Sequence, residues 1–89
     1  MNDLVERMRT ALLAAVKRLA VQVEASQDAE ALTECVTHLR ILLPIFDAAD
    51  MLDEAKILRN AITERVGQLA TKQPWTESLI ALNAVKGML

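Results

Sequence analysis

The segment of residues 32–54 constrains the fold most strongly, because a long apolar pattern runs through it into a proline and an acidic cluster. One set of apolar residues recurs at alternating spacings of four and three, which is the seam of a helix packed against other helices. This set is Leu32, Val36, Leu39, Leu43 and Phe46. A second set, off the seam, is Cys35, Ile41, Leu42 and Ile45. A helix that is apolar on most of its circumference must be covered on most sides.

The composition indicates helix along almost the whole chain. Of 89 residues, only two are Gly and two are Pro, Tyr is absent, and 53% are apolar. So short a chain forms one domain at most, and we expect it to span residues 1–89. The sequence therefore predicts an all-α fold, a small antiparallel helical bundle of three long helices and a short C-terminal fourth helix. We further expect this bundle to associate with another chain.

The first long helix is predicted for about residues 3–25, opened by the capping-box spacing of Asp3 and Glu6. Leu13 and Val21 fall outside the apolar stripe of this helix. That stripe consists of Val5, Met8, Leu12, Val16, Leu19 and Val23.

The second helix is predicted to begin after a cap at Ser26 or Asp28 and to end at Leu43. Pro44 lacks an N–H and crowds the preceding turn, so residues 44–46 should form a distorted last turn. Either this kink directs Ile45 and Phe46 into the chain's own core, or these residues meet a second chain, and we favour the second chain.

The third helix is predicted to follow a cap at Asp47 or Asp50 and to end either at Gly67 or, with Gly67 tolerated inside it, at Thr71. Its apolar stripe is Met51, Ala55, Leu58, Ile62, Val66 and Leu69.

After a loop at residues 72–74, Thr76 is the expected cap of the fourth helix. Trp75 is placed to pack on Ile80, and Gly87 to end the helix. Leu79, Leu82 and Val85 are expected to point inward.

The acidic cluster of Asp47, Asp50, Asp53 and Glu54 is the sharpest local feature. Carboxylates at a helix start are explained by capping and by the helix dipole. The cluster has neither the alternate spacing nor the Gly of a calcium-binding loop, so docking to a basic partner is favoured over metal binding.

Cys35 and His38 stand one turn apart, but the chain holds no other Cys or His. A zinc site needs at least three protein ligands, and a nucleophilic pair needs an orienting third group. We therefore expect Cys35 to be a buried inert thiol, and we predict no metal, no cofactor and no catalytic residue.

Charge and hydropathy argue against nucleic acid and membrane as partners. The net charge is −2, and the ten basic residues never cluster beyond pairs, whereas a nucleic-acid binder normally shows a basic stripe. The uncharged runs are too short to span a bilayer, and the N-terminus carries Asp3 and Glu6 where a secretion signal would be basic. A single Cys is typical of a cytoplasmic protein.

These features predict a small helical protein–protein interaction module that acts as an adaptor, chaperone-like binder or inhibitor and is not an enzyme. The partner would be another protein or a second copy, giving a dimer, and size and acidity suit a bacterial or phage accessory protein. The alternatives are a DNA-associated transcriptional regulator and a small helical enzyme or metal-binding protein. The candidate partner-binding residues are Leu39, Leu42, Ile45, Phe46, Leu13, Val21, Asp47 and Asp50.

Overall fold

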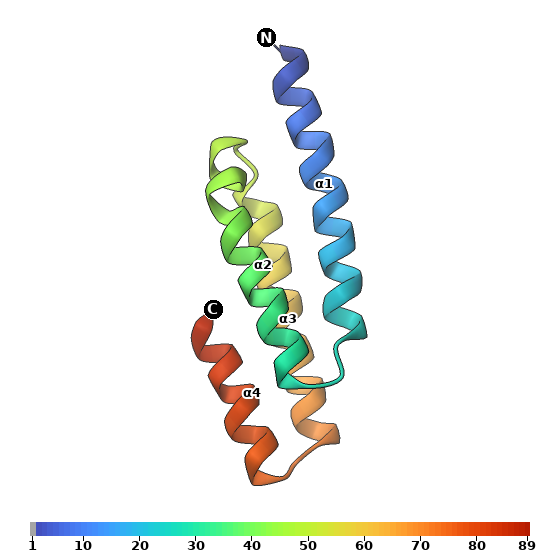
Figure 1. Cartoon of the computed structure of the whole chain (residues 1–89), viewed down its shortest axis with the longest axis vertical. Coiled ribbons are helices and arrows are strands. Elements are labelled where there is room, and N and C mark those ends of the chain that lie inside the picture. The colour runs from blue at the N-terminus through green and yellow to red at the C-terminus, as the bar shows by residue number, and fades with distance from the viewer. Residues whose placement is uncertain (1) are drawn as a thin grey trace.

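The computed structural model describes residues 2–89, with side chains from residue 3 onward, and all of its regular structure is helical. The four helices are α1 (Asn2–Ala25), α2 (Ala29–Ala48), α3 (Leu52–Lys72) and α4 (Thr76–Met88) (Figure 1). They have 24, 20, 21 and 13 residues. The prediction of an all-α fold with three long helices and a short fourth is confirmed.

The α2–α3 hairpin forms the centre of the molecule. Within residues 2–89, α1 and α4 each pack against both hairpin helices but not against each other. Successive helices run in alternating directions along the long axis (Figure 1), and the molecule measures 53 × 20 × 16 Å. The first turns of α1 extend beyond the tip of the hairpin, whereas α4 ends well before that tip (Figure 1).

The core is mostly aliphatic, and all six residues of the stripe predicted for the third helix are buried. In α1, Leu12, Leu19 and Val23 are buried, and Met8 and Val16 pack against the core. Val5 is 42% exposed, so its inward assignment was wrong. Val5 belongs to the first turns of α1, and the start of this helix extends past the hairpin (Figure 1).

The prediction that the second helix ends at Leu43 was wrong, because α2 continues through Pro44 to Ala48. Pro44 lies on the exposed face. There water can bind the carbonyl of Arg40, which loses its usual helical partner. The seam prediction also fails at Leu43, which is 40% exposed, while Phe46 is fully buried.

The turn between α2 and α3 satisfies backbone groups without the expected acidic cap. Asp47 is a residue of α2, and the N-cap of α3 is Met51, which makes no side-chain cap. The N–H of Met51 donates to the carbonyl of Phe46 (2.8 Å), and the N–H of Asp50 donates to that of Asp47 (3.1 Å). This is the Schellman arrangement, and Asp50 occupies its left-handed position with φ = 57°. The capping role predicted for Asp47 or Asp50 was therefore wrong.

The starts of α2 and α4 give one confirmation and one correction. Asp28 caps α2 through its Oδ1, which accepts a hydrogen bond from the N–H of Ala31 at 2.9 Å, as predicted. The N-cap of α4 is Trp75 instead of Thr76, and it makes no side-chain cap. The helix also continues through Gly87 to Met88.

The inward residues predicted for α4 are only partly as expected. Leu82 and Val85 are buried, but Leu79 is exposed. Both members of the expected staple, Trp75 and Ile80, are largely exposed as well.

Candidate functional site

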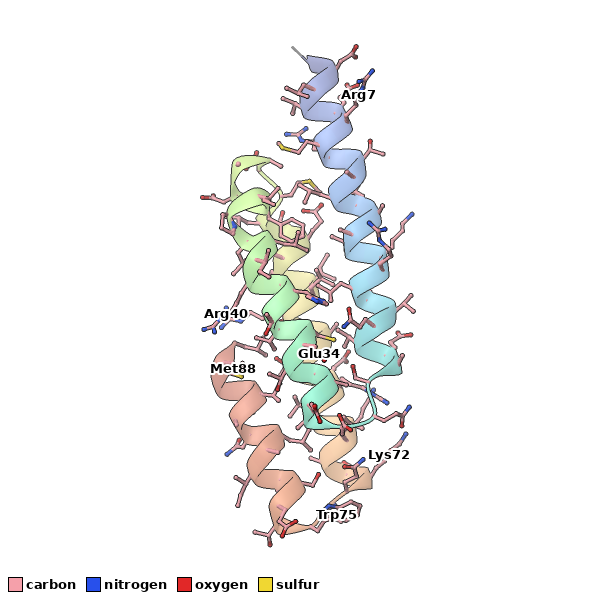
Figure 2. The ribbon with its side chains drawn as sticks, in the orientation of Figure 1. Arg7, Glu34, Arg40, Lys72, Trp75 and Met88 are labelled. Atoms are coloured by element: carbon pink, nitrogen blue, oxygen red, sulfur yellow. The ribbon has the colours of Figure 1, made fainter. Side chains whose placement is uncertain are left out.

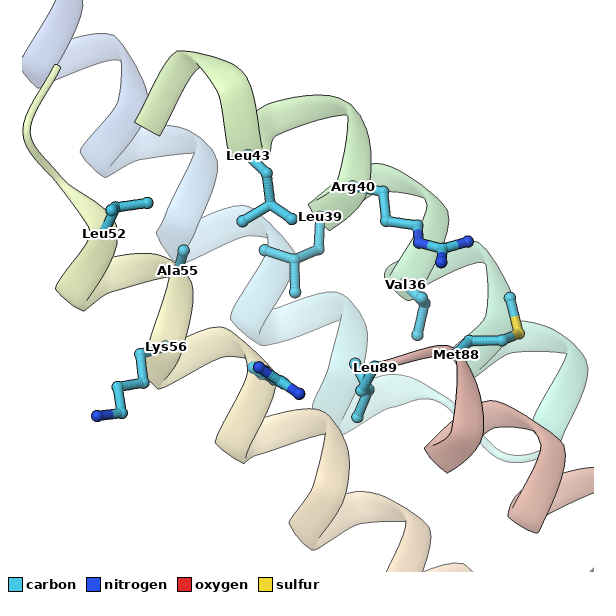
Figure 3. Close-up of a pocket in the computed structure, with 10 residues that line it drawn as sticks. Val36, Leu39, Arg40, Leu43, Leu52, Ala55, Lys56, Met88 and Leu89 are labelled. Atoms are coloured by element: carbon cyan, nitrogen blue, oxygen red, sulfur yellow. The ribbon is translucent and has the colours of Figure 1, made fainter. Parts of the chain in front are cut away.

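An open groove lies between α2 and α3, beyond the end of α4 (Figure 3). It exists because α4 has 13 residues while α2 and α3 have 20 and 21, so α4 covers only part of its side of the hairpin. The groove encloses about 450 Å³. Its apolar lining is Val36, Leu39 and Leu43 from α2, Leu52 and Ala55 from α3, and Met88 and Leu89 at the end of α4.

The apolar side chains of the groove differ in depth. Val36, Leu39 and Ala55 are buried and form its floor. Leu43 is 40% exposed and Leu52 is 51% exposed, and these two stand on opposite sides near the hairpin tip (Figure 3). The small side chain of Ala55 leaves room for a helix to approach closely. A recessed floor with exposed apolar walls is the geometry of a site that receives an apolar side-chain stripe.

Three basic residues complete the lining. Arg40 extends from α2, and Lys56 and Arg59 extend from α3. All three side chains are exposed, and no Asp or Glu belongs to the lining. Figure 3 shows Arg40 and Lys56 on opposite sides of the apolar floor. The groove is therefore apolar at its centre and positively charged at both edges.

The predicted partner-binding residues do not form one surface. Leu39 is 4% exposed and forms part of the groove floor, whereas Phe46, at 0% exposure, is enclosed in the chain's own core. The helices α1, α3 and α4 together cover the inner face of α2. Leu42 is partly buried and packs on the same core.

The predicted partner-binding residues that are exposed lie on several faces of the molecule. Leu13 and Asp50 line one shallow depression of about 350 Å³ between α1 and the hairpin tip, together with Arg9, Met51 and Glu54. The Nε of Arg9 there donates to the carbonyl of Ala49 at 3.2 Å. Val21, Ile45 and Asp47 are exposed but line neither this depression nor the groove.

Ile45 and Leu43 lie on opposite flanks of α2. Leu43 stands seven residues after Val36 and lines the groove with it. Ile45 stands seven residues after His38, whose Nδ1 lies 3.3 Å from Oε1 of Gln22 in α1. Residues seven apart share a helix face. Ile45 therefore belongs to the α1 side of α2 and Leu43 to the α4 side.

The groove contains residues that sequence reasoning did not select, chiefly Leu52, Arg40, Lys56 and Arg59. Their helix positions were predictable, because each lies beside the apolar stripe of its own helix. The available signal was the length of the fourth helix, which is too short to cover the hairpin. Packing between the helices decides on which side of the hairpin the fourth helix lies. The apolar stripe of a single helix does not contain this information.

The thiol of Cys35 is fully buried, and its Sγ lies 3.6 Å from the Oγ of Ser26. Burial raises the pKa of Cys35 above its usual value of 9.0, and the hydrogen bond with Ser26 only partly offsets this. A thiol that stays protonated is a poor nucleophile and a poor metal ligand. Within residues 3–89, no three side chains of His, Cys, Asp and Glu are grouped to hold a metal ion.

Comparison of the chain with protein-family models, with curated proteins and with solved structures gave no match. Across residues 2–89, each helix falls short of the length and apolar character that crossing a membrane requires.

Proposed function

We propose that this chain is a small antiparallel helical module that binds a helix of another protein in the groove between α2 and α3. The observation that carries the proposal is the incomplete cover of the hairpin, because α4 leaves Leu43 and Leu52 exposed above a buried apolar floor. The occupant would take the place that a longer α4 would have filled. The activity is binding without catalysis, and the free buried thiol of Cys35 suits a reducing, cytoplasmic location.

The dimensions of the groove fit a helix. The groove lining on α2 runs from Val36 to Leu43, which is about 10 Å at 1.5 Å per residue and corresponds to about two turns of a partner helix. Such a helix would contact the groove with apolar residues spaced as i, i+3, i+4 and i+7. Its stripe would lie on Leu39 and Ala55, with Leu43 and Leu52 along its sides.

A titration with a neutral model helix tests this proposal. The probe is a fluorescein-labelled peptide of roughly 14 residues with leucine at the stripe positions and glutamine elsewhere, and its fluorescence anisotropy reports binding. Leu43→Asp places a carboxylate in the groove wall and should weaken binding about tenfold or more, because the charge would be desolvated by the peptide.

Ile45→Asp is the matched control, because Ile45 is also 40% exposed and lies on the same helix but on the other flank. It should leave the affinity for the peptide within about twofold of the original value, a change of about 0.4 kcal/mol. Absence of peptide binding, or equal weakening by both substitutions, would refute the groove as the site.

Self-association is a second candidate function, supported by apolar residues outside the groove. Leu4, Ile41 and Ile45 are 75%, 64% and 40% exposed. Light scattering would measure the mass of the chain in solution. A dimer that Ile41→Asp and Ile45→Asp together dissociate would support this candidate, and a monomeric chain would refute it.

A further inference from the structure

We infer that the partner helix is acidic, with glutamate or aspartate flanking its apolar stripe on both sides. This inference rests on the proposed function, since it specifies the chemistry of the helix that the groove receives. It is carried by the charges around the groove, where Arg40 lies at one edge, Lys56 and Arg59 come from the opposite helix, and no acidic residue belongs to the lining.

These three charges contrast with the rest of the chain. The chain has 12 acidic and 10 basic residues, so a groove whose charged side chains are all basic departs from the overall balance. In the part of the chain that the structure describes, the side chains of Arg40, Lys56 and Arg59 form no hydrogen bond with another residue. Their charges are thus available to an incoming group, and complementary charge at the edges of an interface directs partner choice more than it adds affinity.

The helix dipole of α4 accounts for only part of this arrangement. Basic residues near a helix C-terminus are stabilising, and Arg40 lies close to the end of α4 at Met88 (Figure 3). The dipole effect falls off within the last turn, however, and Lys56 comes from the second turn of α3, which starts at the hairpin tip. A fold-stabilising role therefore leaves Lys56 unexplained, whereas an acidic occupant contacts all three basic residues.

The shape of the groove favours a helix over a lipid surface as the acidic occupant. The floor is recessed, since Leu39 is 4% exposed beneath walls formed by Leu43 and Leu52. A flat bilayer surface would touch the basic edges but leave this floor empty. A helix inserts its apolar stripe to the floor and brings its flanking carboxylates level with the edges.

Two charged versions of the model peptide test the inference. Both keep the leucine stripe, and the flanking positions are glutamate in one and lysine in the other, two residues of similar helix propensity. At low ionic strength the original chain should bind the glutamate peptide at least tenfold more tightly than the lysine peptide. Added salt should reduce this difference, because the charge pairs are solvent-exposed.

Charge reversal at the groove provides the decisive variant. The triple substitution Arg40→Glu, Lys56→Glu and Arg59→Glu should invert the preference for the two peptides. The triple substitution Arg7→Glu, Lys17→Glu and Arg18→Glu changes the net charge equally on α1, and it should leave the preference for glutamate intact. All six residues are exposed, and circular dichroism checks that both variants stay helical.

The outcomes separate the inference from the proposed function. Equal binding of both peptides, abolished by Leu43→Asp, would overturn the acidic partner while leaving the groove as a helix-binding site. Binding of neither peptide would overturn both. The remaining test uses vesicles that contain phosphatidylserine. If the chain sediments with these vesicles and Leu43→Asp abolishes this sedimentation, the occupant of the groove is a lipid surface instead of an acidic helix. That result would overturn the inference.

Discussion

The guanidinium of Arg65 donates two hydrogen bonds to the carbonyl oxygen of Ser26, with distances of 3.0 Å from Nε and 2.8 Å from Nη2. This contact joins the middle of α3 to the turn between α1 and α2. It satisfies a backbone carbonyl that follows the last residue of α1, where no helical partner is available. Arg65 thus anchors the end of α1 against the hairpin.

Removing this anchor should destabilise the fold. We expect Arg65→Ala to lower the free energy of unfolding by about 1.5–3 kcal/mol, because the lost hydrogen bonds involve a charged donor. Arg18→Ala, at an exposed position of α1, should change it by no more than about 0.5 kcal/mol. Urea unfolding followed by circular dichroism compares the two, and equal small effects would show that the contact contributes little.

Asp50 adopts a left-handed backbone conformation that Gly accommodates without strain. Asp50→Gly should therefore stabilise the chain by up to about 1 kcal/mol, while Asp50→Val should destabilise it by about 1–2 kcal/mol. Thermal unfolding gives the order of stability, with Gly above Asp and Asp above Val. A valine variant as stable as the original would contradict the left-handed turn.

Pro44 lies inside α2 at an exposed position. Because Ala there restores the N–H donor to the carbonyl of Arg40 and removes the ring clash, Pro44→Ala should raise the free energy of unfolding by about 1–3 kcal/mol. Chemical denaturation measures this change. Destabilisation would instead show that Pro44 sets a bend on which the packing of Phe46 depends.

Cys35 should give the stability of the chain a pH dependence on the alkaline side. Burial raises the pKa of this thiol above 9.0 in the folded state, so the unfolded chain loses the proton first as the pH rises. The stabilising contribution is complete below pH 9.0 and is lost as the pH rises from there through the folded pKa. Cys35→Ala should remove this part of the alkaline loss.

The same burial predicts that a thiol reagent such as dithiobis(nitrobenzoate) reacts with Cys35 only after unfolding. Reaction rates measured with and without urea check this expectation. Rapid labelling of the folded chain would contradict the buried, protonated thiol.

The sequence predicted the helices well and the surface poorly, and Phe46 and Leu43 show why. Each lies on the apolar seam of α2, and periodicity identifies both as core residues. Which of them is covered depends on where the neighbouring helices end, and that is fixed by packing between distant segments. Val5 was misassigned for the same reason, since α1 extends past the hairpin that would have covered it (Figure 1).

Individual polar contacts were equally hard to predict. Helical periodicity places Arg65 outside the core stripe, and only the fold brings Ser26, 39 residues away in sequence, within hydrogen-bonding distance. The basic edges of the groove depend on three-dimensional placement in the same way. Arg40 and Lys56 come from different helices, and neither lies in a run of basic residues in the sequence. Figure 2 shows how charged side chains are otherwise spread along the molecule.

Mapping the bound peptide onto the chain tests the helix-binding groove most directly. Adding the glutamate-flanked peptide to a chain with labelled methyl groups allows the leucine and isoleucine signals to be followed by NMR. We expect the methyl signals of Leu43, Leu52 and Leu89 to shift or broaden, while those of Ile45 stay in place. Changes centred on Ile45 and Ile41, with Leu43 and Leu52 unaffected, would place the interaction on the α1 side of α2 and contradict the groove.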